Sequence, residues 1–389
     1  VNSNSPVSVA IGAYFIAARN IPAVNLIAID APTAEGISFL DFDSIRVQVE
    51  DYLIANNLVD GLNYLVTTKG FPLRIEVSDC DTLNQFTKCS SVDSELALIL
   101  GPHSGGILGI GYVDNPFFSS VVNHQHALDG LYLVTRLDAL TEEDVLDLID
   151  RSGSDLPVDR TTSLLVGDIS NFSDPGILAY LIDQMNSVFA PLETQGWNVI
   201  VETTNAMLPA TSEVAIYIGE DSLQANGIPD LSWTLGGFGF AWTVNSALSF
   251  DPIGTTPGHL RTASLISGGA TGARGNVAPI FGIPNYYTHH TLERYLDTAY
   301  HFNLAESAYA GILCLSWMYE VIGDPKTSIA WSSPAGLADD PRTAPLAVVP
   351  NPCDGSFVLR RTKGQPPGLV VMDGLGRIIP HTMSIRSQD

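Results

Sequence analysis

The sequence predicts an α/β protein with a mainly parallel sheet that is covered by helices on both faces. Helix-like and strand-like segments alternate along most of the chain, and the strand-like segments are apolar throughout. Strands of that kind are typical of parallel sheets buried between two helical layers. Hydrophobic residues make up 45% of the 389 residues and charged residues only 15%, so the chain can bury a large core.

The first expected element is a helix over Val7–Arg19. Ser5 can cap it, and Pro6 can take its first position, where the missing N–H of proline is no loss. Asn25–Ile29 is expected to be a strand. A doubly wound sheet normally begins with a strand ahead of its first helix, and here only the first two residues are available for it. We expect either that this strand has been removed or that the sequence begins late.

The remaining elements follow from apolar periodicity. Phe42–Asn57 has an apolar stripe at helical spacing, and Thr141 can cap an acidic first turn of a helix over Glu142–Arg151. The other expected helices are Val92–Leu100, Pro175–Phe189, His259–Ser267, His289–His301 and Leu304–Val321. The other expected strands are Leu62–Thr67, Leu131–Arg136, Ser163–Val166, Trp197–Val201, Val214–Ile218 and Phe240–Val244.

Composition divides the chain into an α/β domain at 1–331, a linker at 332–345 and a small β module at 346–389. The linker is rich in Ser, Pro, Ala and Asp, which is typical of loops. A split of the first domain into two subdomains near 155–160 also fits the pattern. The module is too short to hold a large core alone. Its expected strands are Ser356–Arg360 and Leu369–Met372.

The chain is strongly acidic, with 42 acidic and 18 basic residues and a net charge of −24. Such a charge opposes binding to nucleic acid or to an anionic membrane surface. No run approaches the roughly 18 apolar residues that a membrane-spanning helix needs. We therefore expect no nucleic-acid partner and no membrane insertion, and a chain that is mature or trimmed after export.

Gly268–Asn276 is the densest glycine run. A phosphate-binding loop would follow a strand and usually contain a lysine, whereas a helix is expected before this run and no lysine lies in it. We expect a tight turn where backbones pack closely, and no cofactor.

The four cysteines lack the spacing of a zinc site. Cys80 and Cys89 bracket the polar loop Asp81–Lys88, and a disulfide there would contribute roughly 2–3 kcal/mol and indicate an oxidising compartment. Two free surface thiols are the alternative. Cys314 lies in an apolar run that is expected to be helical, and is predicted to be a buried core residue.

Histidine and aspartate clusters offer further candidate sites. Without an acidic or thiol partner in a fixed frame, the histidines are expected to be solvated loop side chains. The aspartates do not fit the twelve-residue calcium loop, so no metal is assigned and calcium stays open. The histidines are His103, His124, His126, His289 and His290. The aspartate pairs are Asp41/Asp43 and Asp79/Asp81.

Several strings over most of residues 1–330 resemble a family of secreted bacterial proteins. They are Asn4–Pro6, Arg19–Pro22, Tyr64–Arg74, Ser91–Leu96 and Tyr132–Asp138. The resemblance implies export, and it implies no particular activity.

Two strands of the later half end in short turns. Ala215–Gly219 is followed by Glu220, and Phe240–Val244 by Asn245–Ala247. This order resembles the gingipain-type, caspase-like cysteine peptidases, whose corresponding turns carry the catalytic His and Cys. The resemblance implies a caspase-like sheet with a degenerate dyad at Glu220 and Ser246. A serine hydroxyl beside an ordinary carboxylate is a poor nucleophile, so no catalytic residue is predicted.

The tail also carries a resemblance. Pro350–Leu359 and Val370–Arg377 resemble the C-terminal sorting domain of type IX secretion cargo, which implies surface export. The usual last strands are absent after Ile385, so an unpaired strand edge is expected at this end as well as at the N-terminus.

Three functions stay open. The leading one is a non-catalytic, exported structural protein at the cell surface or outside the cell that self-associates as a homo-oligomer or filament. The second is a hydrolase or peptidase with an atypical site near the carboxyl ends of the strands. The third is an adhesin or glycan binder. Its aromatic candidates are Trp233, Trp242, Tyr286 and Tyr287, although core packing is the simpler expectation for Trp242.

Overall fold

The computed structural model describes most of the chain. The described residues are 1–76, 89–102, 113–169, 175–204, 208–219, 229–241, 262–277, 287–297, 300–331, 347–349 and 358–360. Contacts divide the chain into two units, Val1–Ser332 and Ser333–Asp389. In the second unit, β16 (Ala347–Val349) pairs antiparallel with β17 (Val358–Arg360), and the expected strand Leu369–Met372 lies outside the described residues.

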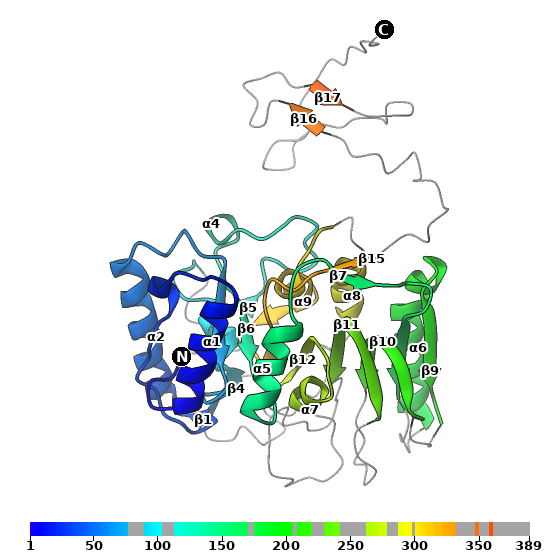
Figure 1. Ribbon diagram of the computed structural model, residues 1–389, viewed down its shortest axis with the longest axis horizontal. Coiled ribbons are helices and arrows are strands. Elements are labelled where there is room, and N and C mark those ends of the chain that lie inside the picture. The colour runs from blue at the N-terminus through cyan, green and yellow to red at the C-terminus, as the bar shows by residue number, and fades with distance from the viewer. Residues whose placement is uncertain are drawn as a thin grey trace. The chain divides into compact units, whose positions relative to one another are not determined.

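The first unit is built on a sheet in which eight described strands pair in the order β2-β6-β14-β12-β11-β10-β8-β9 (Figure 1). Every neighbouring pair is parallel except β12 and β14. The predicted mainly parallel α/β sheet is therefore confirmed. The strands are β2 (Tyr64–Thr68), β6 (Leu133–Leu137), β8 (Leu164–Asp168), β9 (Asn198–Glu202), β10 (Thr211–Gly219), β11 (Leu231–Ala241), β12 (Gly272–Asn276) and β14 (Tyr319–Gly323).

The antiparallel pair divides the sheet into two halves. The first half is β2, β6 and β14, and the second half is β8 to β12. The strands of the second half run opposite to those of the first. The carboxyl ends of the second half therefore lie at the same edge as the amino end of β14.

Helices cover both faces of this sheet (Figure 1). On one face α1, α5 and α7 contact each other in that order, and on the other α6, α8 and α9 do. The sheet needs small residues on both faces, since a side chain at Gly239 would meet α7 and one at Gly272 would meet α9. The helices are α1 (Pro6–Ala18), α2 (Phe39–Ala55), α3 (Val92–Leu96), α4 (His126–Asp129), α5 (Glu142–Arg151), α6 (Pro175–Thr194), α7 (Thr262–Ser267), α8 (Thr288–Leu296) and α9 (Leu304–Ala310).

Short strands complete the first unit. They pair as β1-β3-β4, as β5 with β13 and as β7 with β15. These strands are β1 (Gly36–Ile37), β3 (Arg74–Glu76), β4 (Cys89–Ser91), β5 (Val113–Asp114), β7 (Leu156–Val158), β13 (Cys314–Leu315) and β15 (Ile329–Trp331). No helix among the described residues is long and apolar enough to cross a membrane.

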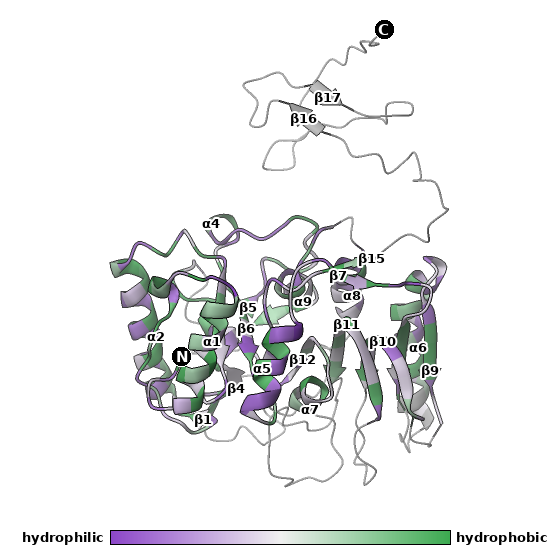
Figure 2. Cartoon of the chain, viewed as in Figure 1, coloured by the Kyte–Doolittle hydropathy of each residue, from purple (hydrophilic) through white to green (hydrophobic). Residues whose placement is uncertain are grey.

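Local sequence signals explain the helix starts. Ser5 Oγ accepts a hydrogen bond from the Ser8 N–H ahead of α1, as predicted. Thr141 and Asp144 form a reciprocal capping box at α5, which also agrees with the prediction. In Figure 2, α5 alternates between hydrophilic and hydrophobic residues along its turns, and its apolar side is the buried one.

The expected strand over Asn25–Ile29 is wrong. A short 3₁₀ helix (Ala23–Asn25) takes its start, and the rest makes a single parallel bridge, between Ile29 and Asn2. A strand needs a neighbour along its length, and this segment has one only at its end.

The turn expected over Gly268–Asn276 and the long helix expected over Leu304–Val321 are also wrong in part. A turn ends at Gly269, where φ is +111°, and the following residues form the central strand β12. The long run breaks at Gly311, where an added Cβ would lie 3.0 Å from the Tyr287 carbonyl oxygen, and its remainder forms β13 and β14. Cys314 on β13 is buried, as predicted.

Candidate functional site

The carboxyl ends of the second half form one continuous edge, which we call the strand-end edge. Asp168 at the end of β8 pairs with Gly219 of β10, and Gly219 pairs with Ala241 of β11. Asn276 at the end of β12 pairs with Tyr319 at the start of β14. Open α/β sheets place their ligands at such an edge.

The two degenerate dyad positions follow the ends of β10 and β11 in the sequence. Glu220 directly follows Gly219, and Ser246 comes five residues after Ala241. The two strand ends are neighbours, since Gly219 pairs with Ala241. Glu220 and Ser246 themselves lie outside the described residues.

Described carboxylates at the strand-end edge are held by hydroxyl groups. The Tyr217 hydroxyl donates to Asp168 Oδ2 over 3.0 Å. Thr262 Oγ1 donates to Glu320 Oε1 over 3.1 Å, and both of these residues are buried. Each of these carboxylates is therefore oriented by a neighbour on an adjacent element.

Glu95 on α3 is a buried acid near the start of β14. Ser316 Oγ donates to Glu95 Oε1 over 2.5 Å. Burial raises the pKa of the Glu95 carboxyl to about 7, although hydrogen bonds from Ser316 and Ser90 lower it. The neighbouring Ser91 Oγ donates to the Tyr319 carbonyl, which places α3 beside the start of β14. A carboxyl with that pKa can exchange protons near neutral pH.

Arg136 is a buried charge that several neighbours bind, and we call Arg136 and these neighbours the Arg136 clamp. Arg136 on β6 donates two hydrogen bonds to the carboxylate of Asp93, over 2.9 and 2.8 Å. It also donates to the carbonyl oxygens of Phe71 and Pro72. Arg136 is 0% exposed and Asp93 is 2% exposed. The clamp joins α3, β6 and the loop after β2, so we assign it a structural role.

Sequence reasoning did not single out Glu95 or the Arg136 clamp. Both lie in strings that carry the resemblance to secreted proteins. A usable signal was nevertheless present, because Arg136 interrupts an apolar strand and a charge inside a buried strand needs a partner.

The cysteines do not supply a nucleophile within the described residues. Burial raises the pKa of the Cys314 thiol to about 12, which keeps it protonated. Cys80 lies outside the described residues, as does the side chain of Cys89. The Cys80–Cys89 disulfide therefore stays a prediction.

The expectation of solvated histidines is wrong for His124 and His126. His124 is buried, with Nδ1 lying 2.8 Å from Asp129 Oδ2, and burial lowers its pKa. His126 stacks on the Tyr132 ring with 3.8 Å between centroids. The loop is packed rather than solvated because an aromatic core, including Phe117, lies beneath it.

The other histidines and the aspartate pairs offer little metal chemistry. His289 and His290 are half-buried, and His103 lies outside the described residues. Asp41 completes the cap of α2, and Asp43 pairs with Arg46 over 2.7 Å. Asp79 and Asp81 also lie outside the described part. Across the residues that are described, no group of three His, Cys, Asp or Glu side chains could hold a metal ion.

Two of the four aromatic candidates lie within the described residues. Trp233 is half-buried and lies against Gly237 and Gly239 of its own strand. Tyr287 is also half-buried and forms an edge contact with the Phe118 ring. Trp242 and Tyr286 lie outside the described residues.

Solved structures that resemble this chain do so only distantly, and two of them are described here. The Arg-specific cysteine proteinase gingipain R matches with 13% identity and a TM-score of 0.43, over 74% of this chain and 68% of that chain. A structure described as a protease matches with 11% identity and a TM-score of 0.39, over 77% of this chain and 73% of that chain. These values are too low to assign an activity. No protein-family model and no curated protein matches the chain.

Proposed function

We propose that this protein is a non-catalytic, exported structural protein that self-associates. The proposed lack of peptidase chemistry rests on one observation. β10 and β11 end side by side, and the chain continues from these ends with Glu220 and with Asn245–Ala247 instead of a His and a Cys. Thiol catalysis needs a thiolate and a base within hydrogen-bond reach, and no cysteine occurs in residues 220–230 after β10 or in residues 242–261 after β11.

An inhibitor and substrate experiment tests this proposal. We expect no labelling at the strand-end edge by thiol-directed inhibitors and no turnover of Arg or Lys peptides by the full chain. Ser246→Ala, Glu220→Gln and Cys314→Ser should each leave the labelling and the turnover as they are in the natural chain. Turnover that vanishes in Ser246→Ala would contradict the proposal.

Export is the second part of the proposal. It is supported by the strings that resemble secreted proteins, by the sorting-type tail and by the acidic charge. Peptide mapping without reductant should find Cys80 linked to Cys89. Free thiols at both residues, after isolation without reductant, would remove the cysteine argument for an oxidising compartment.

Self-association is the third part. β16 and β17 pair only with each other among the described residues of 333–389, and open strand edges recruit partner strands. Because a net charge of −24 opposes close approach, assembly should strengthen as salt screens it. Sedimentation over a salt series, with and without residues 346–389, tests this. A chain that stays monomeric throughout would contradict it.

A hydrolase is the second candidate, and Glu95 favours it. A carboxyl with a pKa near 7, hydrogen-bonded to Ser316 and lying beside the strand-end edge, has the properties of a general acid or base. A hydrolase would show hydrolysis whose rate depends on pH near 7. Glu95→Gln should abolish that hydrolysis while the variant stays folded.

A further inference from the structure

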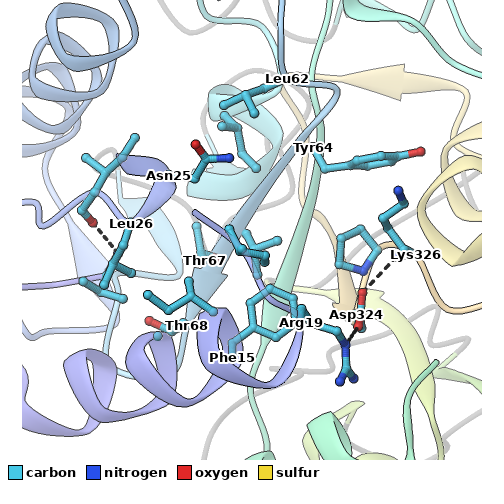
Figure 3. Close-up of a pocket in the computed structure, with 18 of the residues that line it drawn as sticks. Phe15, Arg19, Asn25, Leu26, Leu62, Tyr64, Thr67, Thr68, Asp324 and Lys326 are labelled. Carbon is cyan, nitrogen blue, oxygen red and sulfur yellow. Dashed lines mark hydrogen bonds and ion pairs between the residues drawn. The ribbon is translucent and has the colours of Figure 1, made fainter. Parts of the chain in front are cut away.

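The two outer strands of the large sheet differ in what lies beside them. β2 borders a pocket of about 900 Å³, whose other walls include α1 and residues 25–29 (Figure 3). Phe15 and Arg19 of α1 lie along this pocket, and Arg19 pairs there with Asp324. The chain itself therefore borders that edge of the sheet. β9 lies at the other end, next to α6, and pairs with β8 alone among the described strands (Figure 1).

The outer edge of β9 presents the backbone groups of Val199 and Val201. In a parallel ladder, alternate residues turn both their N–H and their C=O toward the same neighbour. The Glu202 carbonyl accepts from the Ile169 N–H, just beyond β8, so the even-numbered residues of β9 face β8. Val199 and Val201 therefore turn their backbone groups outward, where no described strand pairs with them.

The side chains of β9 are apolar on both faces of the strand. Val201 pairs with Gly167, where a side chain would meet Met185 of α6. Val199 and Val201 are half-buried and therefore lie beneath that helix. Ile200 points to the opposite face and is 41% exposed. Natural edge strands are protected from partners by lysine, proline or a bulge, and β9 has no lysine, no proline and no shift of register against β8.

The sequence of β9, Asn-Val-Ile-Val-Glu, is complementary to itself in the antiparallel direction. In a pair centred on Ile200, Val199 lies opposite Val201 of a second copy, and the two Ile200 side chains lie opposite each other. Every outward N–H then meets an outward carbonyl of the other copy. Each apolar side chain also meets an apolar side chain on its own face.

Charge and hydrogen bonding favour this register over its neighbours. Glu202 lies opposite Asn198 of the second copy, so the acid does not meet a second acid. A shift by two residues would bring Trp197 into the ladder, but its N–H already donates to the Leu192 carbonyl. The register centred on Ile200 is therefore the one that uses the outward groups of β9 without breaking a bond within the chain.

We propose that β9 is a dimerisation edge, at which β9 of a second copy of this chain pairs antiparallel about a two-fold axis through Ile200. The two large sheets would then form one continuous sheet. A contact of this kind is isologous and closes at the dimer. Five residues a side make a small interface, so we expect a dimer that depends on concentration. This inference rests on the proposed self-association and names one contact for it, which does not involve residues 346–389.

Cysteine cross-linking in the full chain tests the register. Ile200→Cys places two Cβ atoms directly opposite each other, roughly 4.5–5.5 Å apart and close to the spacing of a disulfide. Mild oxidation should therefore give a covalent dimer that the natural chain does not form. Asn198→Cys is the matched control and should give none, since the two copies of this residue would lie about 13 Å apart along the strands. Adding Glu202→Cys to Asn198→Cys should produce the cross-link.

Charge substitution at Ile200 tests the dimer itself. Ile200→Lys and Ile200→Glu each place like charges opposite each other, so sedimentation should show a dimer weakened by roughly tenfold or more. The monomer should stay folded, because Ile200 is exposed. An equal mixture of the two variants should recover the dimer, and salt should reduce this recovery. Leu40→Lys, at an exposed residue of α2, is the control and should dimerise as the natural chain does.

The outcomes separate this inference from the proposed function. Assembly that is lost without residues 346–389 and unchanged in Ile200→Lys would overturn the β9 contact and leave the proposed self-association standing. A dimer that is lost in Ile200→Lys and unchanged without residues 346–389 supports the β9 contact. Slow hydrogen exchange of the Val199 and Val201 amides that persists in the diluted monomer would overturn it, because a strand of the same chain would then occupy the edge. A natural chain that is monomeric at every concentration and salt would overturn both.

Discussion

The two halves of the large sheet are stabilised in different ways. In the first half, buried charges tie the elements together: Arg136 and Asp93 are paired between β6 and α3, and Lys69 reaches Asp138 over 3.2 Å. In the second half, strands and helices approach through glycines, as at Gly167 and Gly239. The first half should therefore respond most to lost charges, and the second to added volume.

The largest expected effect comes from breaking the Arg136 clamp. Asp93→Ala should destabilise the protein by about 3–5 kcal/mol, because it leaves the Arg136 guanidinium buried without a counter-charge. Urea unfolding followed by circular dichroism measures this loss. The partly exposed pair of Asp43 and Arg46 gives the matched control, and Asp43→Ala should cost less than about 1 kcal/mol.

The double variant Asp93→Leu with Arg136→Met separates charge from packing. It should recover much of the lost stability, because neither charge is then buried alone. If Asp93→Ala cost no more than Asp43→Ala, the idea of a half held together by buried charge would be wrong.

The next effect is a dependence of stability on pH. The folded state favours neutral Glu95, since its pKa is about 7 against about 4.3 for an unfolded chain. This stabilisation is complete below about pH 4.3 and is lost as the pH rises to 7, a change on the order of 3 kcal/mol. Glu95→Gln should remove the dependence, so the variant should gain on the natural chain as pH rises. Thermal unfolding over pH 4 to 8 measures the difference.

Glu143→Gln is the control for this pH series, since Glu143 is exposed at the start of α5. Its stability should follow that of the natural chain at every pH. A constant difference between Glu95→Gln and the natural chain over pH 4 to 8 would show that Glu95 is ionised in the fold.

Elements governed by local signals were predictable, and those governed by tertiary contacts were not. Ser5 and Pro6 mark the start of α1, and Thr141 marks α5, because a cap acts within one turn. β12 was missed because its sequence, Gly-Ala-Arg-Gly-Asn, has a low strand propensity. It is a strand because β11 pairs with it on one side and β14 on the other.

The site was less predictable than the fold. The order of segments in the sequence predicts that two strands end side by side, and β10 and β11 do so. The unusual pKa of Glu95 depends on burial and on Ser316, which is 221 residues away.

A smaller effect should come from added volume in the second half. A Cβ at Gly237 on β11 would lie 2.7 Å from Trp233 Cε3 and 3.1 Å from the carbonyl oxygens of Thr234 and Val214. Because the backbone atoms cannot move away easily, Gly237→Ala should cost about 1–3 kcal/mol. Gly61→Ala, where the nearest atom is 3.8 Å away, is the control and should be near neutral. Chemical denaturation measures both, and equal stabilities would show that close approach does not limit this half.

The smallest effect tests how the two halves communicate through α5 and α7. Thr141 and Asp144 form the capping box of α5, and Asp144 Oδ2 also accepts from Ser267 Oγ of α7 over 2.7 Å. Thr141→Ala removes only the cap and should cost about 1 kcal/mol in urea unfolding.

The same capping box at α2, formed by Ser38 and Asp41, provides the matched comparison, because no bond from Asp41 to another helix is found within the described part of the chain. Ser38→Ala should lose about as much stability as Thr141→Ala, since each removes one cap. Asp144→Ala should lose more than Asp41→Ala, because it also cuts the bond to Ser267. Equal losses for the two aspartates would mean that the hydrogen bond from Ser267 to Asp144 adds no stability. The contact between α5 and α7 would then depend on apolar packing alone.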